Sequence, residues 1–289
     1  MGEASRASSR VLSTVAPFGF DFDPDRFLLA YKRIGCTSAQ FYYNRDNKPT
    51  VKQVLDTFRR VGMNIDSTHG IFGSDIDPSS PDPAHREHCL RLYEHEGQLA
   101  KDLGGPIVVV HPAAHLPTTP NAPYEFPKIP PDEARKAQSA RTPHLIDFLR
   151  RLADLGDKLG VVFVVENMGF VVPIGHDAPL LGSMIATIGS RYIRMCFDTG
   201  HAHFSGDVYA ALKQCAPVIG YVHMHDNDRQ TDNHLMPGDG TIDWARIAAL
   251  LDELDIAVPR MLEVFEPEAA TERRADEGKL AKLLAPLVS

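Results

Sequence analysis

Histidine, aspartate and glutamate residues stand in this sequence where they could hold a divalent metal ion. Six of them end or directly follow short apolar runs: His69, His111, Glu166, Asp198, His223 and Glu263. Three more lie close behind such runs: His201, Asp232 and His234. Asp232 and His234 are two residues apart, so in an extended segment their side chains face the same way. Imidazole and carboxylate ligands without cysteine suit zinc, manganese, iron or cobalt.

The carboxylates in this set strengthen the metal hypothesis. An isolated carboxylate is costly to bury, and Glu166, Asp198 and Glu263 all end apolar runs that are typical of buried strands. If the three ends met in one mouth, the like charges would repel one another unless a cation neutralised them. We therefore predict a divalent metal site, with zinc or manganese as the expected ion.

The elements that must position these residues alternate along the chain. Short Val-, Ile-, Phe- and Tyr-rich runs predict strands near 11–15, 38–43, 63–68, 106–110, 161–165, 192–197, 218–224 and 260–265. Amphipathic stretches predict helices near 24–34, 50–61, 83–103, 132–159, 178–189, 207–215, 243–254 and 268–287, with Asp243 as a helix N-cap. Eight such units predict an α/β chain folded as a single (β/α)8 TIM barrel, whose active site lies at the C-terminal face of the strands. An open doubly wound sheet is the alternative.

Length and composition favour one domain. The chain has 289 residues, 43% of them hydrophobic, and a formal charge of 30 − 38 = −8. We expect residues 1–10 to form a flexible N-terminal tail and residues 11–289 to form the barrel. No apolar run approaches the length of a membrane span, and no secretory signal is visible. Four scattered cysteines predict reduced, buried thiols and a cytoplasmic protein: Cys36, Cys89, Cys196 and Cys215.

Two long loops would border the mouth of this barrel. Residues 70–83 follow the third predicted strand, and the proline-rich residues 112–131 follow the fourth. Such loops either shape a substrate pocket or form a surface or oligomer contact, and the sequence leaves both open. His115, His176 and His203 could touch a substrate from loops. His225 could support a ligand or contact the substrate.

Several segments together resemble the xylose-isomerase-like TIM-barrel superfamily, which includes sugar isomerases, ketose epimerases and endonuclease IV-type enzymes. They are VVVHPAAH (108–115), VVENMG (164–169), CFDTGHAHFSG (196–206), YVHMHD (221–226), DNHLMPGDGTIDW (232–244) and MLEVF (261–265). Each segment alone is a motif of low specificity, but together they occur in the family's order over roughly residues 60–265. Barrels of this group often pair, so a homo-oligomer is compatible with the resemblance.

The resemblance implies two metal schemes. In the ketose epimerases one divalent ion is held at the positions of Glu166, Asp198, His223 and Glu263, and the two glutamates also exchange the substrate proton. His201 matches a substrate contact in that scheme. In the endonuclease IV type three zinc ions take nine ligands, which match His69, His111, Glu166, Asp198, His201, His223, Asp232, His234 and Glu263.

Charge counting separates the two reactions. One M²⁺ with Glu166, Asp198 and Glu263 gives 2 − 3 = −1, which suits a polyol, whereas three Zn²⁺ with those acids and Asp232 give 6 − 4 = +2, which suits a phosphate. The early loops carry few basic residues, which argues against a nucleic-acid substrate.

We therefore expect a metal-dependent isomerase or epimerase of a sugar, sugar phosphate or related polyol. Glu166 and Glu263 are the predicted catalytic residues, and His201, His225 and Arg229 the predicted substrate contacts. A multinuclear zinc phosphodiesterase or related hydrolase is the alternative. A non-enzymatic binding protein on the same barrel is a third, weaker reading, because every ligand position is filled.

Overall fold

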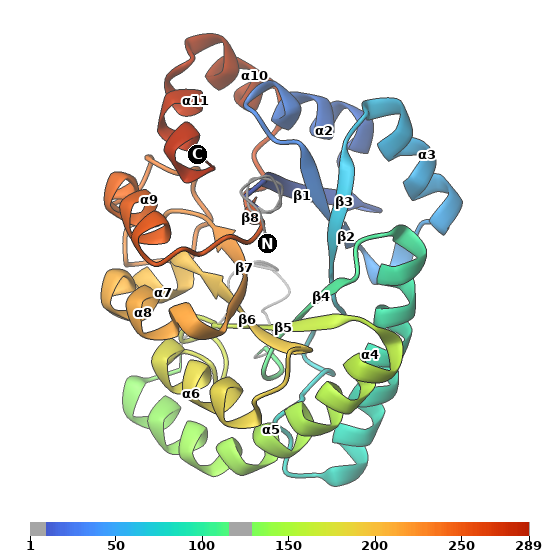
Figure 1. Ribbon diagram of the computed structural model, residues 1–289, viewed down its shortest axis with the longest axis vertical. Helices are drawn as coiled ribbons and strands as arrows, with labels where there is room; N and C mark the ends of the chain where they lie inside the picture. The colour runs from blue at the N-terminus through green and yellow to red at the C-terminus, as the bar shows by residue number, and fades with distance from the viewer. Residues whose placement is uncertain (1–9, 116–128, 289) are drawn as a thin grey trace.

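The computed structural model describes residues 10–115 and 129–288. Residues 1–9 of the predicted tail and most of the predicted loop 112–131 therefore lie outside the described residues. Eight parallel strands close into a barrel, in which each strand pairs with its neighbours in the sequence and the last pairs with the first (Figure 1). The strands are β1 (Leu12–Phe18), β2 (Ser38–Tyr43), β3 (Asn64–His69), β4 (Ile107–Val110), β5 (Val162–Glu166), β6 (Ile193–Asp198), β7 (Ile219–Met224) and β8 (Arg260–Leu262). The predicted (β/α)8 TIM barrel is confirmed.

Helices surround the strands (Figure 1). They are α2 (Pro24–Arg33), α3 (Val51–Val61), α4 (Pro83–Leu103), α5 (Pro131–Leu159), α6 (Ala178–Ile188), α7 (Thr199–Ser205), α8 (Val208–Cys215), α9 (Trp244–Glu253), α10 (Glu268–Glu277) and α11 (Lys279–Leu284). Local signals begin several of them. Thr50 and Gln53 form a capping box for α3, and the Asp243 side chain caps α9 by accepting from the Arg246 backbone N–H, as predicted. No described helix is both long and apolar enough to cross a membrane.

The predicted strands and helices differ from the observed ones in three places. The short helix α7 was not predicted, and it begins where the Asp198 side chain accepts from the His201 backbone N–H. The predicted helix 268–287 is interrupted at Gly278, which adopts a left-handed φ of 67° and separates α10 from α11. The predicted strand 260–265 ends its pairing at Leu262, so Glu263 stands just beyond β8.

The barrel core explains why the strands are so apolar. Residues 163–166 of β5 and 108–110 of β4 are all buried, because neighbouring strands and outer helices cover both faces. The four cysteines are buried with free thiols, as predicted. The early strands also carry buried polar residues such as Gln40 and Ser67, whereas the polar side chains at the carboxyl ends form the site described next.

Candidate metal centre

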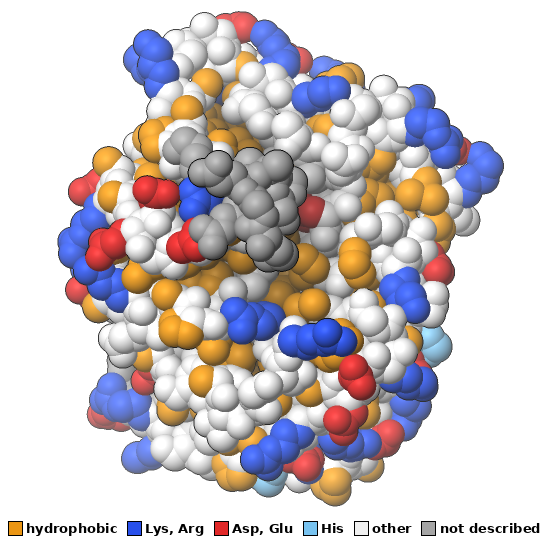
Figure 2. All heavy atoms as spheres, viewed as in Figure 1, with side chains coloured by type: hydrophobic (Ala, Val, Ile, Leu, Met, Phe, Trp, Pro, Cys, Tyr) orange, Lys and Arg blue, Asp and Glu red, His pale blue; other side chains and the backbone are white. Residues whose placement is uncertain are grey.

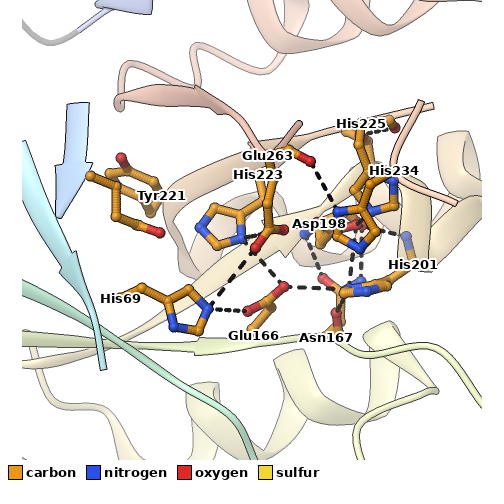
Figure 3. A network of polar contacts seen from close by, with 12 residues as sticks. His69, Glu166, Asn167, Asp198, His201, Tyr221, His223, His225, His234 and Glu263 are labelled. Carbon is orange, nitrogen blue, oxygen red and sulfur yellow. Dashed lines mark hydrogen bonds and ion pairs between the residues drawn. The ribbon is translucent and has the colours of Figure 1, made fainter. Parts of the chain in front are cut away.

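The predicted ligands from β3 to β8 converge at one end of the barrel (Figure 3). The structure brings all nine predicted ligands into three groups, in each of which one possible ligand atom per residue lies within 4.8 Å of the others. The groups are Glu166, Asp198, His223 and Glu263; His69, His111 and Glu166; and His201, His225, Asp232 and His234. In the order just given, we call them the central group, the first group and the third group.

The central group contains three carboxylates around one imidazole. Nδ1 of His223 lies 3.1 Å from Glu263 Oε2, 3.3 Å from Glu166 Oε1 and 4.0 Å from Asp198 Oδ2. All four residues are at most 4% exposed. Two ligands bound about 2.1 Å from a tetrahedral ion lie roughly 3.4 Å apart, so these separations suit a shared divalent cation.

The first group shares Glu166 with the central group. Nε2 of His111 lies 3.2 Å from Glu166 Oε2, and Nε2 of His69 lies 3.9 Å from the same oxygen. Glu166 thus turns one oxygen to each group. A carboxylate in that position can bridge two cations.

The third group is completed by a segment that follows β7. Nε2 of His201 lies 3.0 Å from Asp232 Oδ2, and Nε2 of His234 lies 3.9 Å from Asp232 Oδ1. His225 is close by, but its ring stacks on that of His234 at 3.8 Å with only 7° between the planes. An ion in the plane of one ring cannot lie in the plane of the other, so we take His201, Asp232 and His234 as the donors of this group.

The histidine rings are oriented by hydrogen bonds on their far side. Nδ1 of His69, His201 and His234 lies 3.1, 3.0 and 2.9 Å from the carbonyl oxygens of Gly70, Asn167 and Glu263. Because a carbonyl only accepts, each Nδ1 carries a proton, so that in the neutral ring the lone pair of Nε2 points toward its group.

His111 is held in a similar way by another histidine. Its Nδ1 lies 2.8 Å from Nε2 of His115, and burial followed by the charge of His111 lowers the pKa of His115 to about 3. A neutral His115 can accept a hydrogen bond from Nδ1–H of His111 through its Nε2. His111 then has its own Nε2 available to bind a metal ion. The structure therefore places His115 beside a candidate ligand.

Unpartnered atoms indicate that the donor set fits a cation. A buried side-chain polar atom normally has a hydrogen-bond partner. Six of the nine predicted ligands keep a buried nitrogen or oxygen without one: His69 Nε2, Glu166 Oε2, Asp198 Oδ2, His223 Nε2, Asp232 Oδ1 and Glu263 Oε2. Most of these atoms face the donor groups, where a divalent ion would satisfy them.

The carboxyl groups stay ionised despite their burial. Burial alone would raise the pKa of Glu166 and Glu263, but the nearby His223 outweighs it and holds both pKa values well below their usual range. Burial opposes the ionisation of Asp232 too, and His201 and His234 hold its pKa far below normal. The site thus carries concentrated negative charge.

Protons on histidine balance part of this charge. Burial would lower the pKa of His201, but Asp198 and Asp232 raise it well above the ordinary value. For His223 the neighbouring Cys196, Glu263 and Glu166 together outweigh burial and raise the pKa. A bound cation would take over the role of these protons, so metal binding should release them.

Sequence reasoning missed one residue that organises the centre. Asn167 donates from its amide to the Asp198 carbonyl oxygen and accepts from the Asp198 backbone N–H, both at 2.9 Å. Its own carbonyl accepts from His201. The signal was present in the VVENMG segment, where Asn167 directly follows a buried strand and Glu166.

The three predicted substrate contacts differ in their positions. His201 belongs to the third group, and Nε2 of His225 lies 3.1 Å from Asp198 Oδ1. Arg229 is directed elsewhere, because its guanidinium donates to the backbone carbonyls of His203 and Gly206. Its contact with a substrate stays a prediction.

Comparison with known proteins gives several related sequences and many similar structures. The chain is 25% identical over 208 residues to an uncharacterized protein of Methanocaldococcus jannaschii, which covers 71% of this chain and 65% of that protein. It is 24% identical over 232 residues to a probable endonuclease 4 of Thermoplasma acidophilum, covering 74% and 72% of the two chains. Thus it spans just under two thirds of the first relative.

Among the solved structures, D-allulose 3-epimerase from Methylomonas sp. in complex with D-allulose superimposes with a TM-score of 0.73. The alignment covers 96% of each chain at 15% identity, and this likeness shows the shared fold. A family model described as a xylose isomerase-like TIM barrel matches residues 28–282. Since that match takes in most of the sequence, the chain belongs to the xylose isomerase-like TIM-barrel family.

Proposed function

We propose that this protein is a metal-dependent isomerase or epimerase of a sugar, sugar phosphate or related polyol. The observation that carries the proposal is the central group, in which three carboxyl groups and His223 are buried around one point. Membership of the family supports it, and so does the similar fold of a D-psicose 3-epimerase and an L-ribulose 3-epimerase. Zinc or manganese is the proposed ion.

The chain's own residues would supply binding and proton transfer. A divalent ion held by Glu166, Asp198, His223 and Glu263 would polarise a substrate carbonyl and make the adjacent C–H bond more acidic. Glu166 and Glu263 come from strand ends on different sides of the barrel mouth, and their low pKa values keep them ionised as bases. One would remove the proton and the other would return it on the opposite face.

His201 and His225 lie where they could orient the substrate. Both are buried beside Asp198, and the pKa of each is raised although burial opposes it. In the one-ion scheme their N–H groups would donate to substrate hydroxyl oxygens.

A second candidate function is supported by the first and third groups. With one divalent ion in each of the three groups, six positive charges would face the four carboxylates of Glu166, Asp198, Asp232 and Glu263, a net charge of 6 − 4 = +2. Such a site would attract a phosphoester and activate water for its hydrolysis. The probable endonuclease 4 among the relatives supports this alternative.

The surface favours a small substrate over nucleic acid. Among the described residues that Figure 2 displays on this face, Lys and Arg side chains are interspersed with Asp and Glu and form no continuous basic area. The formal charge of −8 agrees with this proposal. A homo-oligomer and a cytoplasmic location stay predictions.

Isotope exchange and hydrolysis assays separate the two functions. The metal-loaded protein should incorporate solvent deuterium at a carbon next to the carbonyl of one member of a ketose and ketose-phosphate panel. Glu263→Gln should reduce this exchange about 100-fold or more, because it removes an acid–base group. A lack of exchange across the panel, together with cleavage of a phosphodiester such as bis(p-nitrophenyl) phosphate, would favour the hydrolase instead.

A further inference from the structure

The segment that carries Asp232 and His234 is anchored by one buried carboxylate. Asp226 follows β7 and is 0% exposed. Its Oδ1 accepts from the backbone N–H groups of Asn227 at 2.9 Å and Ile242 at 3.1 Å. Its Oδ2 accepts from the Gly238 N–H at 3.0 Å and the Trp244 indole N–H at 2.8 Å. Four donors from both ends of one segment thus meet on this side chain.

Backbone contacts close the same segment. Asp226 and Leu235 exchange two backbone hydrogen bonds of 2.7 and 2.9 Å, which form an isolated antiparallel bridge. Gly240 packs so closely that an added Cβ would lie 2.3 Å from Asp226 Oδ1. The PGDGTIDW sequence therefore wraps around the carboxylate, and only glycine fits at position 240.

The anchored segment holds His234 in an uncommon conformation. His234 has a left-handed φ of 43°, which a residue with a side chain adopts only when its surroundings enforce it. In this conformation its Nδ1 donates to the Glu263 carbonyl and its Nε2 turns toward Asp232. A segment released from Asp226 would relax this residue and separate it from Asp232 and His201.

We propose that Asp226 is a positioning residue that builds the third donor group. It touches none of the metal-facing atoms itself and acts through the placement of Asp232 and His234. The inference rests on the second candidate function in taking the third group as a metal site, which the one-ion scheme does not need. It requires that loss of the Asp226 carboxylate abolishes metal binding by the third group while the central group, built on β5 to β8, keeps its ion.

Asp226→Asn tests this role with little change of shape. The variant replaces one oxygen by an NH₂ group that confronts two N–H donors. Asp239→Asn is the matched control, because Asp239 lies on the same segment but pairs with Arg274 at the surface. Trp244 is the only tryptophan in the chain and is 4% exposed, so its fluorescence reports on the anchor. In the metal-free state, Asp226→Asn should show red-shifted emission and stronger acrylamide quenching, and Asp239→Asn should match the unaltered protein.

Zinc titration of the metal-free proteins provides the second measurement. Asp226→Asn should lose one equivalent or bind it at least about 10-fold more weakly, as when a residue that orients a ligand is removed, with the remaining equivalents unchanged. If Asp226→Asn does not fold, Trp244→Phe removes one donor and should weaken the same equivalent by less.

Two results overturn the inference. Asp226→Asn could bind as many zinc ions as the unaltered protein, with affinities within twofold. This result would contradict the role of Asp226 and would leave the proposed function intact. The unaltered protein could instead bind no more than one zinc ion, which would overturn the inference; one ion would leave the isomerase or epimerase standing, and none would contradict both.

Discussion

At the residue scale, Glu166 occupies the most constrained position in the centre. Its Oε1 faces His223 and His201, each at 3.3 Å, and its Oε2 faces His111 at 3.2 Å. It is 1% exposed, so this carboxylate cannot be hydrated by bulk water. Any cation in the central or first group would contact it, and it therefore joins the two groups chemically.

Glu166→Gln should remove metal from both of these groups. The amide has the same shape but no charge, so the bound metal per chain should fall and catalytic activity should drop about 100-fold or more. Glu253→Gln, on the exposed side of α9, is the control and should change neither. Elemental analysis and a turnover assay measure the two effects. Unchanged metal content in Glu166→Gln would show that the ion lies elsewhere.

Histidine protonation predicts how the metal-free protein responds to pH. The pKa values of His201, His223 and His225 lie above the usual value, so their contribution to stability is complete below about pH 6.5 and is lost as the pH rises through the folded-state pKa. His69 and His115, with pKa values lowered to about 3, act in the opposite direction and are destabilising as pH falls from about 6.5 toward 3.

The free energy of unfolding in EDTA should therefore be greatest near pH 6.5, and added zinc should raise it more at pH 8 than at pH 6 because it replaces histidine protons. Urea unfolding between pH 5 and 9 measures both effects. A metal-free protein that becomes steadily more stable from pH 6 to 9 would contradict the assigned protonation.

At the element scale, α7 couples β6 to β7 through a close contact. The Asp198 side chain accepts from the His201 N–H at 2.6 Å and thereby begins the helix that carries this candidate ligand. Gly200 lies against the His225 ring, and an added Cβ would be only 2.0 Å from Cε1 of that ring. The glycine of the DTGH sequence thus gives His225 room to reach Asp198.

Gly200→Ala should displace His225 and cost about 1–3 kcal/mol in the free energy of unfolding, as overpacking of a buried site does. The shift should also weaken metal binding through Asp198. Gly206→Ala is the matched control at the end of α7, where an added Cβ meets nothing within 4 Å. Chemical denaturation and zinc titration compare the pair. Equal behaviour of the two variants would mean that the His225 contact is not required.

At the scale of the whole molecule, a parallel barrel explains how much of the site was predictable. Each apolar run ends in its polar residue at the same face, so Glu166, Asp198 and Glu263 could be placed together from their positions in the sequence alone. The stacking of His225 on His234 and the carbonyl contacts of Arg229 depend on loop conformations that no periodicity encodes. The Asp226 anchor depends on donors up to 18 residues away.

Metal binding should stabilise the whole barrel, because the ligands come from strands that are far apart in sequence. A ligand that binds only the folded state adds about 2.7 kcal/mol at 100 times its Kd. Zinc should therefore raise the melting temperature of the unaltered protein. It should raise it less in Glu166→Gln.

The metal content of the purified protein tests the central claim most directly. After incubation with zinc or manganese and exhaustive dialysis, plasma mass spectrometry should find at least one tightly held divalent ion per chain, and less in Glu166→Gln. A value near one supports the isomerase or epimerase, and a value near three supports the hydrolase. Retention of no ion by the folded protein with any of zinc, manganese, iron or cobalt would contradict the metal centre.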